Sequence, residues 1–171
     1  APDAEVVWDG GLPVTGWRKE ADGTWTAPVP EGCGAPGSPV SALWINGMRR
    51  VPARTPNARH APGDFPRDEE LFFIDGTVTE KDETGNEVPS QSAFRYRPGD
   101  IRNWRGLEDA RFVIYHSWAT SLLRVASLDE AGQIVSFTGR ARWPFGKWTP
   151  EQWYYVEHLD EVLDRPGEWV H

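Results

Sequence analysis

The sequence predicts an all-β fold, an antiparallel β-barrel or sandwich with one or two short helices. Fifteen prolines and 17 glycines interrupt the 171 residues too often for long helices. Between them recur short runs of β-branched and aromatic residues, which favour strands. The dipeptide Asn46-Gly47 separates two such runs, and this is the strongest short-range signal for a β-hairpin.

The length and composition predict one β-domain over residues 1–171. Only 39% of the residues are hydrophobic, but 10 Trp, 7 Phe and 4 Tyr concentrate the apolar area in a few large rings. We expect most of the ten tryptophans to fill the core.

In the first third of the chain, β-prone runs alternate with segments rich in Gly and Pro. A long surface loop is expected over residues 52–70, which hold four prolines and mixed charges. Strands are predicted at residues 5–8, 24–26, 42–45 and 48–51.

The middle of the chain predicts several further strands. Asp75-Gly76 suggests a turn between strands at 71–74 and 77–79, and residues 81–89 suggest a charged loop. A strand is also expected at 93–96. Runs at 111–116, 121–128 and 133–138, the last two separated by the four-residue loop 129–132, predict a three-stranded meander.

The C-terminal part carries mixed signals. Thr149 and Gln152 form a capping-box pattern with Pro150 at the first helical position, which predicts one helical turn. Residues 153–156 then favour a strand. A short helix is expected over residues 158–163, followed by a last strand at 168–170.

The charge of the chain argues against nucleic-acid partners. Its formal net charge is −8, so a phosphate backbone would be repelled. The basic residues are scattered, with Arg49-Arg50 as the densest pair. No run of 18 apolar residues occurs, so no membrane partner is expected.

No complete catalytic or metal-binding motif stands out in the sequence. The four histidines lack ligand spacing with one another or with Cys33, so we expect no metal site and no cofactor. No G-x-S-x-G pattern is present. We therefore expect no catalytic residues in this chain.

Five residues are candidates for carbohydrate binding. Exposed tryptophan faces can stack on the C–H faces of sugars, and Trp104 and Trp118 have polar neighbours that suggest exposure. His116 lies in a predicted strand and could face a cleft, although a histidine held in the core is the simpler interpretation. Glu157 and His158 end another aromatic strand.

Several segments, in this order, carry a family resemblance. They are the residues 11–17 (GLPVTGW), 43–47 (LWING) with Arg49-Arg50, 53–57 (ARTPN), 94–100 (FRYRPGD), 113–128 around HSW, 154–158 (YYVEH) and 163–169 (LDRPGEW). This arrangement is similar to the β-domain inserted in bacterial right-handed parallel β-helix proteins of the glycoside hydrolase family 141 type. Family 120 β-xylosidases are more distantly similar.

The resemblance implies a non-catalytic accessory domain of a secreted or periplasmic glycoside hydrolase. Residues 1–12 and 165–171 would connect it to the host β-helix of the same chain, and it would shape or cover a glycan-binding cleft. An oligosaccharide would be its possible ligand. The chain departs from the expected pattern at His158, where the resemblance implies Asn.

Two other interpretations remain open. The chain could be a free-standing carbohydrate-binding module, or a purely structural insert that touches no ligand. An insertion predicts that the two chain ends lie close together, with residues 5–8 and 168–170 as the strands that leave and rejoin the host.

Overall fold

The computed structural model describes residues 10–34, 40–57 and 71–171. Although the length suggested one domain, the chain divides into two compact units. One holds the described part of residues 1–43 together with His171, and the other holds residues 44–170. The predicted strand at residues 5–8, and with it the predicted proximity of the chain ends, falls outside the described residues.

In the first unit, two short strands form an antiparallel hairpin. Strand β1 (Arg18–Lys19) pairs with β2 (Trp25–Thr26), which confirms the strand predicted at residues 24–26. In the turn between them, Asp22 Oδ1 accepts hydrogen bonds from the backbone N–H and the hydroxyl of Thr24, at 2.9 and 2.6 Å. These bonds fix the turn and hold the pKa of Asp22 below its ordinary value.

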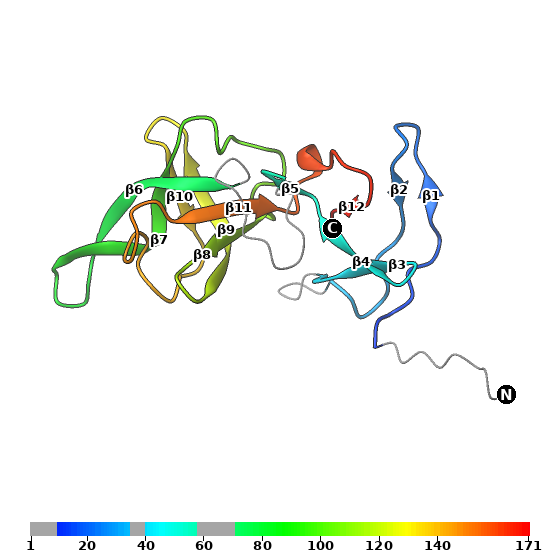
Figure 1. Ribbon diagram of the computed structural model, residues 1–171, viewed down its shortest axis with the longest axis horizontal. Helices are drawn as coiled ribbons and strands as arrows, with labels where there is room; N and C mark the ends of the chain where they lie inside the picture. Colours follow the sequence, from blue (N-terminus) through cyan, green and yellow to red (C-terminus); the bar gives the residue numbers. More distant parts are fainter. Residues whose placement is uncertain (1–9, 35–39, 58–70) are drawn as a thin grey trace. The chain divides into compact units, whose positions relative to one another are not determined.

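The second unit is built around a closed antiparallel β-barrel, so the all-β prediction is confirmed (Figure 1). Strand β11 pairs with β8 along one edge and with β6 along the other, and this double pairing closes the ring. In barrel order the strands are β6 (Phe72–Lys81), β7 (Glu87–Tyr96), β10 (Ile134–Phe137), β9 (Thr120–Asp129), β8 (Arg111–Tyr115) and β11 (Trp153–Glu157).

Aromatic rings fill the barrel. Phe94 is fully buried and packs against three other rings, with centroids 5.0–5.5 Å apart: Phe137, Phe145 and Tyr154. Along β9 the buried side chains alternate with exposed ones, as a strand with one face on the core requires. The expectation that most tryptophans fill the core is wrong for the described residues, because Trp104 and Trp169 are buried there whereas Trp17, Trp25, Trp44, Trp118 and Trp148 are exposed.

The predicted meander of residues 111–138 is confirmed as β8, β9 and β10, which pair in that order. The prediction of two strands around Asp75-Gly76 is wrong. Residues 72–81 form one continuous strand, β6, and the register with β7 shifts between Ile74 and Gly76. The glycine marks a β-bulge there and not a turn.

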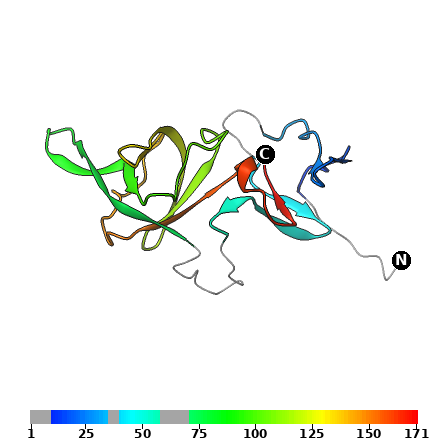
Figure 2. The same cartoon turned by 90° about the horizontal axis from the view of Figure 1, so that it is seen from above.

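The turn between β6 and β7 is shorter than the charged loop predicted at residues 81–89. Asp82 Oδ1 accepts the backbone N–H groups of Thr84 and Asn86, both at 2.9 Å, so the reversal is complete within a few residues. Both views show this hairpin, in green, projecting beyond the rest of the barrel (Figures 1 and 2).

A small second sheet has the order β12–β4–β3. Its strands β3 (Leu43–Ile45) and β4 (Met48–Pro52) are joined by Asn46 and Gly47, which have φ of 53° and 73°. Positive φ at both turn positions is the mark of a type I′ hairpin, so this prediction is confirmed. Strand β12 (Glu168–Trp169) runs parallel to β4, with Glu168 opposite Val51.

Replacing Gly47 by Val should lower the free energy of unfolding by about 1–2 kcal/mol, because a β-branched residue is strained at positive φ. A Cβ atom at this position would meet nothing within 4 Å, so the cost comes from the backbone and not from a clash. Chemical denaturation of Gly47→Val and Gly47→Asn measures it. Since Asn tolerates this conformation, Gly47→Asn should cost clearly less, and equal costs would contradict the turn assignment.

The capping-box prediction at Thr149–Gln152 is wrong, because no helix forms there. The expected helix at residues 158–163 is a single 3₁₀ turn, Asp160–Val162. Part of the predicted surface loop forms a further strand, β5 (Arg54–Thr55), which pairs with the end of β11. Residues 58–70 of that loop lie outside the described ranges.

Candidate functional site

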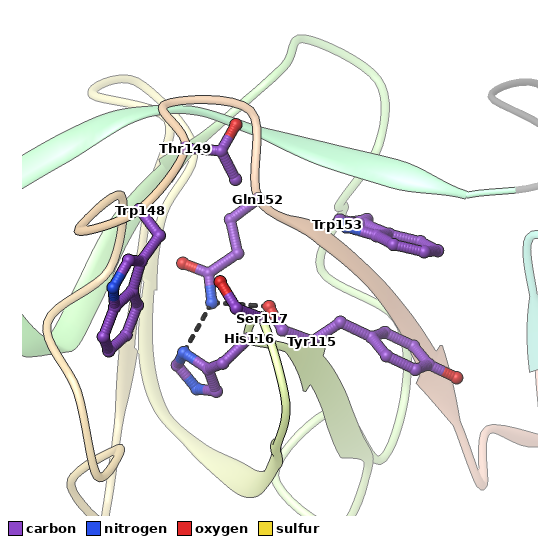
Figure 3. A pocket seen from close by; sticks show the side chains of 7 residues that line it. All are labelled: Tyr115, His116, Ser117, Trp148, Thr149, Gln152 and Trp153. Atoms are coloured by element: carbon purple, nitrogen blue, oxygen red, sulfur yellow. Dashed lines mark hydrogen bonds between the residues drawn. The ribbon is translucent and has the colours of Figure 1, made fainter.

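A cavity of about 120 Å³ opens at one end of the barrel, between the end of β8 and the segment that leads into β11. Figure 3 shows its wall, with Trp148 on one side of Gln152 and the rings of Tyr115 and Trp153 on the other. The lining residues are Tyr115, His116, Ser117, Trp148, Thr149, Gln152 and Trp153.

The side chain of Gln152 holds this wall together. Its Nε2 donates to the backbone carbonyl of Tyr115 at 2.6 Å and to Nδ1 of His116 at 2.8 Å (Figure 3). Its Oε1 accepts the backbone N–H of Gly146 at 3.0 Å. Because a backbone donor and a backbone acceptor each fix one end of the amide, its orientation follows from the hydrogen bonds. Gln152 is 4% exposed, and its side chain links the end of β8 to the segment around Gly146.

This amide also fixes the tautomer of His116. Since Nε2 of Gln152 is a donor, Nδ1 of His116 must accept, and the ring proton lies on Nε2. That Nε2–H faces Oγ of Ser121 at 2.9 Å. Burial lowers the pKa of His116 below its ordinary value, which favours the same neutral form.

The pair His116–Ser121 is therefore arranged for structure and not for nucleophilic attack. A histidine that activates a serine accepts the hydroxyl proton, whereas here Nε2 already carries its own proton. Ser121 is also 8% exposed and does not line the cavity. The hydrogen bonds of His116 thus shape the cavity wall.

An exposed aromatic cluster flanks the cavity. Trp148 makes edge-to-face contacts with Trp118 and Trp143, at centroid distances of 5.0 Å each. Lys147 Nζ lies 4.6 Å from the ring centroid of Trp143 and 5.0 Å from that of Trp148. Trp118 is 72% exposed and Trp148 41% exposed, so much of their ring area faces solvent. We call Trp118, Trp143, Trp148 and Lys147 the aromatic surface.

Of the predicted carbohydrate-binding residues, Trp118 lies on the aromatic surface and His116 lines the adjoining cavity. The prediction that Trp104 is exposed is wrong, since it is 4% exposed in the core. Its polar neighbours gave the wrong signal because residues 101–110 form tight turns that bury every third side chain. Those buried residues are Ile101, Trp104, Leu107 and Ala110.

Glu157 and His158 are also placed away from the cavity. Glu157 is 4% exposed and forms an ion pair with Arg111, whose Nη2 lies 3.3 Å from Nε2 of His158. His158 has φ of 65°, a conformation in which Asn, Asp and His are several-fold enriched among residues other than Gly. Its ring packs edge-on against Trp169. Both residues therefore pack at the end of β11, and neither lines the cavity.

Sequence reasoning did not identify Gln152 or Trp148 as site residues. For Gln152 the capping-box pattern pointed to a different role. For Trp148, the signal was its place close to Trp143 and Lys147 in a segment that contains Pro and Gly. Large rings in such a loop are not part of a strand that could direct them into the core.

Within the described ranges, no group of three His, Cys, Asp or Glu side chains could hold a metal ion. No helix in the same ranges is long and apolar enough to cross a membrane. Comparison of the chain with protein-family models, curated proteins and solved structures gives no significant match.

Proposed function

We propose that the β-barrel binds glycan through its aromatic surface, as an accessory domain of a secreted, carbohydrate-active parallel β-helix protein. The observation that carries the binding proposal is the exposure of Trp118 beside a cavity lined by both aromatic and polar side chains. Large exposed apolar groups gathered at one place mark binding sites more often than they arise by chance.

The geometry of the aromatic surface suits a sugar ring. Trp118 and Trp148 meet edge to face at an interplanar angle of 61°, so they present two differently oriented ring faces. The C–H groups of a pyranose carry partial positive charge, and the face of an aromatic ring carries partial negative charge. Stacking therefore adds attraction to the burial of apolar area.

The cavity beside the surface supplies groups for hydrogen bonds. Ser117 and Thr149 contribute hydroxyls to its lining. With a volume of about 120 Å³ it is well below the roughly 300–1,000 Å³ of drug-sized ligand pockets, so it would take one substituent of a sugar and not a whole chain. The polysaccharide would then lie across the aromatic surface.

The context in a host enzyme rests on the family resemblance alone. The motifs quoted above span most of the chain, and they imply that the barrel accompanies a glycoside hydrolase whose catalytic carboxylates lie elsewhere. An accessory domain of this kind would need a binding surface but no reaction centre, in agreement with a site built from tryptophans.

Replacing Trp118 by Ala should weaken glycan binding about tenfold, since an aromatic stacking contact contributes about 0.5–1.5 kcal/mol beyond its burial. Titration of the full chain with xylo-, cello- and galacto-oligosaccharides, followed by tryptophan fluorescence and calorimetry, measures the change. Trp44→Ala is a matched control, because Trp44 is 62% exposed and lies on β3, outside the aromatic surface. No binding to any of these glycans, or the same loss in both variants, would contradict the proposal.

A further inference from the structure

A second cavity, of about 240 Å³, lies between β4, β5 and the turn that precedes β12. Its lining is strongly basic in a chain whose net charge is −8: four arginines face one carboxylate. The charged and amide side chains that line it are Arg49, Arg50, Arg54, Asn57, Arg165 and Glu168.

The fold brings these arginines together from distant parts of the sequence. The parallel pairing of β12 with β4 sets Glu168 opposite Val51, so the turn at Arg165 lies beside Arg49 and Arg50. Gly167 has φ of 91°, and a Cβ atom there would lie 3.4 Å from Nη1 of Arg50. A residue with a Cβ atom at position 167 would strain the turn because of this positive φ.

Arg50 is held in place by the backbone around it. Its Nη2 donates to the carbonyl of Ile45 at 3.4 Å, and its own carbonyl accepts the indole N–H of Trp169 at 3.3 Å. Its Nε is enclosed by protein and has no hydrogen-bond partner in the described part of the chain. Arg54 is positioned as well, with its guanidinium 5.5 Å from the ring centroid of Tyr155.

The carboxylates next to the cavity form their hydrogen bonds with groups other than the guanidinium groups of Arg49, Arg50 and Arg165. Oε2 of Glu168 accepts the backbone N–H groups of Asp164 and Arg165, both at 3.2 Å. Oδ1 of Asp164 accepts Nδ2 of Asn57 at 2.8 Å. Across residues 10–34, 40–57 and 71–171, no ion pair links Arg49, Arg50 or Arg165 to a carboxylate.

We propose that this cavity binds a small oxyanion, either the carboxylate of an acidic sugar or a sulfate or phosphate group. Planar guanidinium groups match these ligands because each can donate two parallel hydrogen bonds to two oxygens. The volume lies below that of drug-sized pockets, so a single sugar ring or one end group is the right scale. The site is separate from the aromatic surface and does not depend on the proposed glycan stacking.

The test is calorimetric titration of the full chain, at constant ionic strength, with glucuronate, inorganic sulfate and inorganic phosphate. Glucose serves as the uncharged ligand. The double variant Arg49→Gln/Arg165→Gln should weaken oxyanion binding at least tenfold. The matched control is Arg102→Gln/Arg105→Gln, which removes the same charge from two exposed arginines outside the cavity and should leave the affinity unchanged.

Tighter binding of glucuronate than of sulfate and phosphate would assign the site to acidic sugars, and the reverse order would assign it to tetrahedral oxyanions. Equal weakening in both double variants would mean general charge attraction and would overturn the proposal. So would the lack of any oxyanion binding, or equal binding of glucose and glucuronate. Trp118→Ala should leave oxyanion binding intact, which separates a failure here from a failure of the proposed glycan surface.

Discussion

Replacing Glu157 by Gln should lower the free energy of unfolding by about 3 kcal/mol, because it leaves the guanidinium of Arg111 without its charge partner in the barrel wall. Glu157 on β11 lies directly opposite Arg111 on β8, and their side chains are 6% and 21% exposed. Loss of one partner from a buried pair typically costs about 3–5 kcal/mol, and the partial exposure of Arg111 places this pair at the lower end. Urea denaturation followed by tryptophan fluorescence measures the change.

Two further variants separate this effect from a general loss of charge. The double variant Arg111→Met/Glu157→Gln should be less destabilised than the sum of the two single variants, because it leaves no uncompensated charge. Glu151→Gln breaks the ion pair with Arg97. The side chains of Glu151 and Arg97 are 70% and 43% exposed, so this change should lower the free energy of unfolding by no more than about 1 kcal/mol. Equal costs for Glu157→Gln and Glu151→Gln would contradict the structural role assigned to Glu157.

Replacing Gln152 by Leu should also lower the free energy of unfolding by about 3 kcal/mol. The change deprives three groups of their partners, the carbonyl of Tyr115, Nδ1 of His116 and the backbone N–H of Gly146. Each polar group left buried and unsatisfied costs about 1–3 kcal/mol, and access to the adjoining cavity lets water offset part of the total. Chemical denaturation measures it, and a cost below about 1 kcal/mol would contradict the network.

The hydrogen-bond network around Gln152 also makes the stability of the fold depend on pH, through His116. Because burial lowers its pKa in the folded chain, the unfolded chain binds more protons below the ordinary pKa of 6.5. The stability due to neutral His116 is thus complete above pH 6.5 and is lost as the pH falls below it. Nitrogen NMR of the imidazole should show a neutral ring protonated at Nε2 in the wild type at pH 7, and protonation at Nδ1 would contradict the assigned tautomer.

Asp100 opposes this trend within the same pH range. Burial raises the pKa of Asp100 to about 6, and the nearby charge of Arg97 counteracts only part of that rise. Its carboxyl therefore takes up a proton in the folded state as the pH falls through 6, which favours folding relative to neutral pH. The contribution of His116 should be measured in an Asp100→Asn background, where this second titration is absent.

The sequence predicted those elements whose signals are local. The type I′ turn at Asn46-Gly47 follows from two residues that tolerate positive φ, and the meander follows from β-branched and aromatic runs. The bulge at Gly76 was misread because a glycine beside Asp75 signals a turn equally well. Whether such a glycine marks a turn or a bulge depends on whether the partner strand continues past it. The partner here is β7, which lies elsewhere in the sequence.

The candidate site could be predicted only in part, for a similar reason. Trp118 has polar sequence neighbours and is exposed, but Trp104 has them too and is buried. What separates the two is the turn geometry of residues 101–110, which directs one side chain in three toward the core. Gln152 has the sequence of a helix cap, yet its amide finds partners more than 30 residues away in Tyr115 and His116.

The double pairing of β11 has a consequence for how this protein is made. A ribosome releases the other five barrel strands first, and until residues 153–157 emerge, β6 and β8 each present an edge without its final neighbour. At about 5–20 residues per second, the nascent chain carries these open edges for at least about a second after β10 has been synthesised. Unpaired strand edges are the surfaces on which β-rich chains aggregate, so late ring closure exposes the barrel to aggregation during translation.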